Sequence, residues 1–156
     1  MRVLAIDPGF DRLGIAVIEG DPSKPVHVWS ECVEPQKGAP QARLSEVYHS
    51  VHEAIQTYSP DCLAIESLFF STNVKTAMKV AEARGAVLAA AGASSLDVQE
   101  YSPQEVKLAV TGYGAADKKA VASMIPHLIL LPSKKRLDDE LDAIALGIAA
   151  LTRRTR

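Results

Sequence analysis

Three short, mostly apolar runs separated by brief turns open the chain, and they constrain its fold more than any other feature. They cover residues 2–6, 13–19 and 26–33. The first run ends at Asp7-Pro8-Gly9, which is typical of a turn, and the third alternates apolar and polar side chains. Runs this short and this close together predict three consecutive strands that pair as an antiparallel meander.

Helical and strand patterns alternate along the rest of the chain. Helical spacing covers residues 44–58, 73–91, 103–112, 117–126 and 137–152, and short apolar runs cover Cys62–Glu66 and 96–99. We expect Asn73 to cap the second helix, and Ser102-Pro103-Gln104-Glu105 is a capping box that starts the third. The order β-β-β-α-β-α-β-α-α-α predicts an α/β fold, with a mixed five-stranded sheet and helices on both faces.

Length and composition fit one domain over residues 1–156. Apolar residues make up 47% and charged residues 23%, which is enough to bury one core but not two. Cys32 and Cys62 are too few for a disulfide framework and lack metal-ligand spacing. No apolar run approaches the roughly 20 residues of a membrane span. The sequence therefore predicts a cytoplasmic protein without a membrane segment.

The net charge argues at first against a nucleic-acid-binding protein. The 17 basic and 19 acidic residues sum to −2. The charge is uneven, because residues 1–70 hold 5 basic and 10 acidic side chains, whereas residues 71–156 hold 12 and 9. We expect the last arginines, Arg153, Arg154 and Arg156, to form a solvated tail.

Four acidic residues stand where they have no evident packing role. Asp7 and Glu66 each end an apolar strand, and they would lie side by side if the first and fourth strands are neighbours. Asp139 and Asp142 are three residues apart and share one face of the last helix. Clustered carboxylates raise one another's pKa unless cations neutralise them. Oxygen-only ligand sets suit Mg²⁺ or Mn²⁺, and paired ions of this kind serve phosphoryl transfer.

A structural explanation also exists for each acid taken alone. Asp7 precedes Pro8-Gly9 and suits a turn. The helix dipole favours acids in the first turn of a helix, which accounts for the acids between 138 and 142. Spacing alone leaves a metal site and a set of structural acids both open.

Seven short motifs follow one another along nearly the whole chain, from about residue 2 to residue 150. They are Asp7-Pro8-Gly9, Ala64-Ile65-Glu66 followed by Phe69, Ala83-Arg84-Gly85, Gln104-Glu105-Val106-Lys107, Gly112-Tyr113-Gly114, Asp117-Lys118, and Asp139 with Asp142-Ala143. In this order and at these spacings they resemble the RuvC family of Holliday-junction resolvases. A single motif would be weak evidence, whereas seven in register are specific.

The resemblance implies an RNase H-like fold and a structure-specific endodeoxyribonuclease. It implies symmetric paired nicks in a four-way DNA junction during homologous recombination and repair, by two-metal-ion hydrolysis that leaves 5′-phosphates. It further implies two Mg²⁺ ions per active site, with Mn²⁺ as a substitute. The implied partners are a second copy of the chain, joined along the helix at 73–91, and the branch-migration proteins RuvA and RuvB.

The resemblance also assigns roles to the acids. Asp7 and Glu66 match the first two catalytic, metal-binding acids of the family, and Asp139 and Asp142 match the third and fourth. Asp138 precedes Asp139 and lies four residues before Asp142. The choice between Asp138 and Asp139 as the third acid therefore stays open, although the family spacing favours Asp139.

The same comparison implies a DNA-binding surface. Its members are Phe69, Asn73, Arg84, Lys107 and Lys118. Lys107 and Lys118 match catalytic lysines that contact DNA near the scissile phosphate. Phe69 matches an aromatic residue that the family places against bases near the junction centre, although the adjacent Phe70 could take that place.

Three other functions are compatible with part of the sequence. An RNase H-like enzyme of the YqgF type acting on structured RNA also opens with an Asp-x-Gly strand. An actin-like nucleotide-binding protein shares that loop but needs a second such loop and about twice the length. A module that only bound junctions would have no need of four acids. Setting those four carboxylates aside leaves a formal charge of +2, which removes the objection to a nucleic-acid enzyme.

Overall fold

The first three strands form the predicted meander. β1 (Arg2–Pro8) pairs antiparallel with β2 (Leu13–Asp21), which pairs antiparallel with β3 (Lys24–Val33). β4 (Cys62–Glu66) joins β1 in parallel, and β5 (Val98–Tyr101) joins β4 in parallel, so the strand order is β3-β2-β1-β4-β5. This computed structural model describes residues 1–68 and 74–153. The predicted mixed sheet is confirmed.

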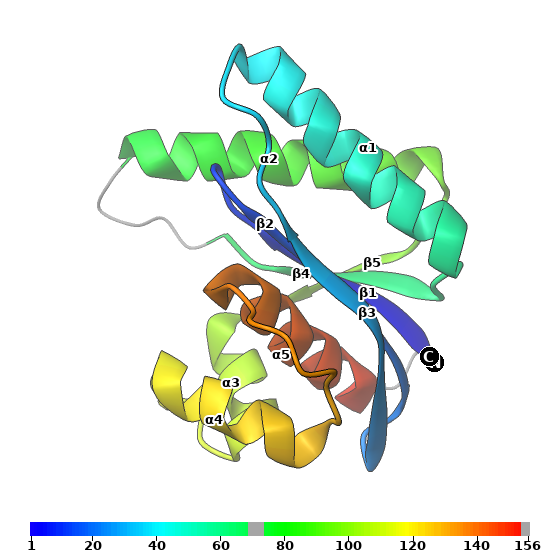
Figure 1. Cartoon of the computed structure of the whole chain (residues 1–156), viewed down its shortest axis with the longest axis vertical. Coiled ribbons are helices and arrows are strands. Elements are labelled where there is room, and N and C mark those ends of the chain that lie inside the picture. Colours follow the sequence, from blue (N-terminus) through cyan, green and yellow to red (C-terminus); the bar gives the residue numbers. More distant parts are fainter. Residues whose placement is uncertain (69–73, 154–156) are drawn as a thin grey trace.

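Helices cover both faces of the sheet, as predicted (Figure 1). α1 (Pro40–Tyr58) and α2 (Val74–Ala93) lie on one face. α3 (Pro103–Thr111), α4 (Lys118–Leu128) and α5 (Asp138–Thr152) lie on the other. Each layer of helices encloses its own hydrophobic cluster against the sheet. In the described part of the chain, no helix is long and apolar enough to cross a membrane.

The central strand β1 shows why its sequence is apolar without interruption. Val3 and Ala5 belong to the cluster under α5, whereas Leu4 and Ile6 belong to the cluster under α1 and α2. All four side chains are fully buried, because a central strand covered on both faces has no solvent side. The alternation fixes the direction of the next side chain, so Asp7 follows Val3 and Ala5 toward α5.

Helix α5 packs closely on the sheet because two glycines leave room for it. A Cβ built on Gly14 of β2 would collide with the backbone oxygen of Asp139, and a Cβ on Gly147 of α5 would collide with Ile18 of β2. The helix is buried along most of its length, from Ala143 to Leu151. Gly14 therefore permits the first turn of α5 to dock on β2, beside the end of β1.

Several predicted boundaries differ from the observed ones by a few residues, as where α1 begins at Pro40 rather than at residue 44, and two of the differences have a clear cause. β5 begins at Val98 rather than at residue 96, because its register is set by pairing with Leu63 on β4. α4 continues past Pro126 to Leu128. Proline removes one backbone donor, but Ile125 is packed in the core, and its carbonyl still accepts from the Ile129 amide at 3.0 Å.

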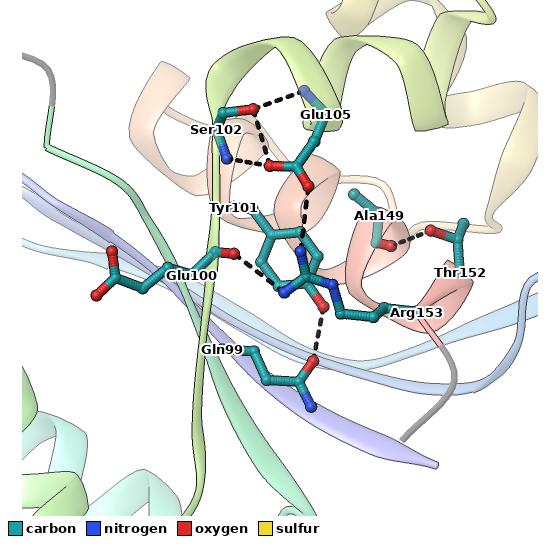
Figure 2. Close-up of polar contacts among 8 residues, drawn as sticks. All are labelled: Gln99, Glu100, Tyr101, Ser102, Glu105, Ala149, Thr152 and Arg153. Atoms are coloured by element: carbon teal, nitrogen blue, oxygen red, sulfur yellow. Dashed lines mark hydrogen bonds and ion pairs between the residues drawn. The ribbon is translucent and has the colours of Figure 1, made fainter. Parts of the chain in front are cut away.

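The predicted capping box at the start of α3 is confirmed. Ser102 Oγ accepts from the Glu105 amide at 3.2 Å, and Glu105 Oε2 accepts from the Ser102 amide at 2.7 Å. Figure 2 shows the pair above the ring of Tyr101. The reciprocal bonds satisfy two backbone donors and so fix where the helix begins.

Arg153 is exposed, as a solvated tail would be, but it makes specific contacts that the sequence did not predict. Its guanidinium lies 4.5 Å from the centre of the Tyr101 ring, donates to the Glu100 carbonyl at 3.2 Å, and pairs with Glu105 at 3.1 Å (Figure 2). The contact ties the end of α5 to β5 and to the start of α3. Arg154 and Arg156 lie outside the described residues.

Candidate active site

The register of the sheet brings Asp7 and Glu66 together. Ile6 of β1 pairs with Ile65 of β4 in parallel, so the next residue on each strand is an acid, and the two acids are neighbours. Cys62 and Ala64 of β4 face the α5 side of the sheet, and by alternation Glu66 follows them. Asp7 and Glu66 therefore both point toward α5, as the sequence predicts.

Helix α5 supplies the remaining acids from the opposite side. Asp142 lines a pocket of about 260 Å³ together with Glu66, Lys107 and Lys118. The pocket opens between the end of β4 and the helices α3, α4 and α5. The sequence prediction that these residues share one site therefore agrees with their placement.

The electrostatics of Asp7 reflect this crowding. Burial, together with repulsion from Asp142, Glu66 and Asp139, raises the pKa of the Asp7 carboxyl to about 7, against partial relief from Lys118. Asp138 makes no comparable contribution and is exposed, whereas Asp139 is half-buried. Of the two candidates for the third acid, the structure favours Asp139.

Glu66 and Asp142 are perturbed in the same direction. Burial and repulsion by Asp142 raise the pKa of Glu66, although Lys107 and Lys118 oppose the change. Burial raises the pKa of Asp142 as well, despite a hydrogen bond from Lys118. The three carboxyls therefore hold their charge less readily than isolated acids do, which is the condition that a bound cation relieves.

Two basic residues pair with the acids of α5. Lys118 Nζ lies 2.6 Å from Asp142 Oδ2, and Arg12 Nη1 lies 3.7 Å from Asp139 Oδ2. The Arg12 side chain is 46% exposed, so this pair is weak and open to solvent. Arg12 was not singled out from the sequence; its place just after the turn that follows Asp7 is the signal that identifies it.

The donor set fits a hard divalent cation. Asp7, Glu66, Asp139 and Asp142 offer only carboxylate oxygens, the ligands that Mg²⁺ and Mn²⁺ prefer. Among residues 1–68 and 74–153, however, no three Asp, Glu, His or Cys side chains already form a preassembled metal cage. In this arrangement the two α5 acids are directed at Lys118 and Arg12.

The predicted DNA-binding residues fall into three groups. Lys107 and Lys118 lie at the acid site. Phe69, Phe70 and Asn73 lie outside the described residues. Arg84 is buried, with its side chain 9% exposed, and its guanidinium binds the Glu66 backbone carbonyl and the Glu100 carboxylate. These contacts favour a structural role for Arg84 over the phosphate contact that the sequence suggested.

Glu140, between the two acids of α5, has a different environment that sequence reasoning missed. Its side chain is 5% exposed, and Oε1 accepts from Ser30 Oγ at 2.6 Å. The same oxygen pairs with Lys134 at 2.8 Å and with Arg136 at 3.2 Å. This cluster anchors the first turn of α5 to β3. The i,i+4 spacing of Arg136 and Glu140 was the available signal.

A mixed α/β sheet with acids at adjacent strand ends and on the facing helix defines an RNase H-like nuclease. The family model described as crossover junction endodeoxyribonuclease RuvC matches residues 3–150. The chain belongs to the RuvC family, a family of metal-dependent nucleases. The prediction made from the seven motifs is confirmed.

Curated relatives agree with the family match. The chain is 42% identical to the crossover junction endodeoxyribonuclease RuvC of Desulforamulus reducens over 151 residues, which cover 95% of this chain and 91% of that protein. It is 41% identical to the protein of the same name from Thermosipho melanesiensis over 148 residues, or 94% of each chain.

Solved structures support the fold. A T. thermophilus RuvC in complex with Holliday junction substrate has a TM-score of 0.89 at 32% identity, covering 96% of this chain and 92% of that one. The yeast mitochondrial Holliday junction resolvase Ydc2 has a TM-score of 0.72 at 12% identity over 96% of this chain and 78% of its own, a likeness of fold alone.

Proposed function

We propose that the protein is a Holliday-junction resolvase that nicks opposed DNA strands during homologous recombination and repair. The observation that carries the proposal is the convergence of Asp7, Glu66 and Asp142, whose burial and repulsion raise the Asp7 pKa to about 7. Such crowding destabilises a protein unless a cation binds there. A module that only bound phosphate would gain nothing from it. Membership of the RuvC family supports the same function.

The cofactor in this proposal is a pair of Mg²⁺ ions, with Mn²⁺ as a substitute. Asp7 would be shared by both ions, Glu66 would hold one, and Asp139 with Asp142 would hold the other. Bound Mg²⁺ supplies the Lewis acidity that activates water and stabilises the leaving oxygen in phosphodiester hydrolysis. The oxygen-only donor set supports this choice of metal.

Two lysines are proposed to bind the scissile phosphate beside these acids. Lys118 is 61% exposed and is paired with Asp142, so it is free to transfer to phosphate when a cation takes its place on the carboxylate. Lys107 faces the same pocket next to Glu66. Attack on the phosphate with departure of the 3′ oxygen leaves 5′-phosphate ends, as the family resemblance implies.

The test is cleavage of a mobile four-way DNA junction in Mg²⁺, with the nicks mapped on all four strands. Symmetric nicks on opposed strands are the expected result, and preferential cleavage of structured RNA would instead support the YqgF-type alternative. Family membership does not favour that alternative. In Asp7→Asn, cleavage should fall by at least about 10³-fold, because a charged group at the reaction centre is lost.

Binding separates catalysis from recognition in the same experiment. In Ca²⁺, Asp7→Asn should bind the junction as tightly as the wild-type protein, because the variant keeps the shape of the site and removes a negative charge. A wild-type protein that binds junctions but never nicks them in Mg²⁺ or Mn²⁺ would support the binding-only function instead.

A homodimer joined along α2 is part of the proposal. Val74 and Met78 are 68% and 61% exposed, and their spacing of four residues places them on the same side of this helix. A twofold dimer would place two active sites on opposed strands of a junction. Met78→Glu should therefore lower the mass measured by light scattering, whereas Leu130→Glu, which changes a 92% exposed leucine elsewhere, should not.

Family membership is the basis for three further elements of the proposal. They are partnership with RuvA and RuvB, action in the cytoplasm, and contact of Phe69 with bases near the junction centre. Phe69→Ala should leave folding intact and weaken junction cleavage, because stacking contributes about 1–3 kcal/mol per base. Equal cleavage by this variant and the wild-type protein would exclude that role.

A further inference from the structure

Arg84 of α2 is buried against the strand end that carries Glu66. Its side chain is 9% exposed, and its two terminal nitrogens have different acceptors. Nη1 donates to the backbone carbonyl of Glu66 at 2.7 Å, and Nη2 lies 2.7 Å from Oε1 of Glu100. The arginine therefore bridges the last residue of β4 and the neighbouring strand β5.

Glu100 occupies a defined position on β5. It pairs with Ile65 across the parallel strands, and its successor Tyr101 pairs with Glu66. Figure 2 shows the Glu100 carboxylate pointing away from the Tyr101 and Arg153 side chains, on the side of the sheet where α2 lies. Glu100 can therefore hold Arg84 from α2 while its own backbone is bound by Arg153.

The Glu66 carbonyl belongs to the same residue as a carboxylate of the acid site. That carboxylate lines the pocket with Lys107, Lys118 and Asp142, so the position of the Glu66 backbone decides where it is presented. After Glu66 the strand pairing ends, with one further bond from the Ser67 amide to the Tyr101 carbonyl at 2.8 Å. Glu66 itself pairs with Tyr101 on β5, whereas the pairing of β4 with β1 ends at Ile65, so the bond from Arg84 adds a restraint at the last residue of β4.

We propose that Arg84 is a positioning residue, which holds the backbone of Glu66 so that its carboxylate is presented to the metal, and that Glu100 orients Arg84. The inference rests on the proposed function, in which Glu66 is a metal ligand. Arginine suits this task because its planar guanidinium directs two donors at two acceptors at once, whereas the single ammonium of lysine does not. Arg84 acts through Glu66 and does not touch the DNA.

The test compares Arg84→Gln and Arg84→Lys with the wild-type protein in two measurements. The Mg²⁺ concentration for half-maximal junction cleavage should rise by roughly 10–100-fold, the range for lost support of a metal ligand. Mn²⁺ affinity measured by calorimetry without DNA should fall by a similar factor. Lysine should not rescue either value, because it keeps the positive charge but not the two fixed donors of the guanidinium.

Junction binding in Ca²⁺ distinguishes positioning from a phosphate contact. If Arg84 positions Glu66, junction affinity and its dependence on salt should match those of the wild-type protein. Weaker binding, a salt slope reduced by about one and an unchanged Mg²⁺ requirement would overturn the inference and make Arg84 a DNA contact.

Glu100→Gln tests the second half of the inference in a variant that preserves the shape of the side chain. It should raise the Mg²⁺ requirement by less than Arg84→Gln does, and the double variant should match Arg84→Gln alone because the two residues act as one unit. Additive effects of the two changes, or no effect of Glu100→Gln, would show that Glu100 does not orient Arg84.

Arg153→Gln is the matched control for a general loosening of β5. Arg153 also binds Glu100, but at the backbone and from the opposite face of the sheet (Figure 2). The Arg153→Gln change should lower thermal stability without changing the Mg²⁺ requirement. A rise in that requirement equal to the rise in Arg84→Gln would overturn the inference. Full cleavage by Asp7→Asn would instead refute the proposed function itself, whatever Arg84 does.

Discussion

Glu140 and Asp142 lie two residues apart on α5 but have opposite electrostatic environments. Glu140 is buried, and hydrogen bonds from Lys134 and Ser30 hold its pKa below the ordinary value although burial acts the other way. Asp142 is half-buried with one exposed lysine partner, and burial raises its pKa. One acid is fully compensated by the protein, and the other is not.

The difference separates a structural acid from a functional one. A buried carboxylate that only supports the fold needs partners within the chain, because unpaired buried charge is costly. Asp7, Glu66 and Asp142 are compensated only in part, by Lys107 and Lys118, and the pKa of each stays raised. We therefore assign the remaining compensation of these acids to the metal. Glu140, in the same helix, is an acid whose charge is compensated by partners within the chain.

The largest predicted effect is on folding stability. Glu140→Ala should lower the free energy of unfolding by about 3–5 kcal/mol, because Arg136, with its side chain 7% exposed, is left without its acid. Asp142→Asn should change it by less than about 1 kcal/mol, since its pair with Lys118 is open to solvent. Urea unfolding in EDTA measures both. Equal destabilisation by the two changes would remove the distinction between them.

The second prediction concerns pH. The Asp7 pKa is raised from 3.8 to about 7, so between these values the folded protein keeps a proton that the unfolded chain releases. The free energy of unfolding of the metal-free protein should therefore fall as pH rises from about 4 to about 7, by roughly 4 kcal/mol, since each unit of pKa difference is worth about 1.4 kcal/mol. Glu66 and Asp142 act in the same direction.

Urea unfolding in EDTA at pH 5 and pH 8 measures this effect. Asp7→Asn should lose most of the dependence, because the amide does not titrate. Mg²⁺ should also restore stability at pH 8, since a bound cation favours the ionised carboxylates. A wild-type protein that gains stability over the same pH range in EDTA would show that the acid site is compensated after all.

The sequence predicts the acid site, but it does not predict the paired environment of Glu140. Alternation and chain order are local signals, so the mixed sheet and the adjacency of Asp7 and Glu66 are predictable once β1 and β4 are taken as neighbours. The partners of Glu140 are not local: Ser30 lies 110 residues away, on another strand. The helix dipole therefore seemed to explain Glu140 as well as the acids beside it.

The contacts of Arg84 and Arg153 could not be predicted from the sequence, for the same reason. A basic residue on a helix or near a terminus is commonly exposed, and its sequence neighbours do not say otherwise. Arg84 is buried because the Glu66 carbonyl and Glu100 come to it from two strands. Arg153 is held because Tyr101 and Glu105 form a surface that exists only after β5 and α3 have docked.

The third prediction tests how α5 is placed. Gly14→Ala should cost about 1–3 kcal/mol, because the new methyl group displaces the backbone at Asp139. Since Asp139 and Asp142 move with that turn, junction cleavage should fall by more than the lower stability alone would explain. Gly147→Ala is the matched control: it meets Ile18 about two turns further along α5 and should destabilise similarly with a smaller loss of cleavage. Equal cleavage losses would contradict this.

The smallest predicted effect concerns Ser30, the serine that donates to Glu140. Ser30 Oγ donates to Glu140 at 2.6 Å in the core, and Ser23 Oγ donates to Asp21 at the same distance on the exposed turn between β2 and β3. Ser30→Ala should lower the free energy of unfolding by about 1–2 kcal/mol, whereas Ser23→Ala should change it by less than about 0.5 kcal/mol. The two bonds to carboxylate have the same length, but Ser30 Oγ also lies 2.7 Å from His27 Nε2, so a larger effect of Ser30→Ala would reflect the loss of both buried contacts, whereas water replaces the lost donor at Asp21. Equal effects would mean that Lys134 and Arg136 already satisfy Glu140, and that the compensation of this acid comes from charge alone.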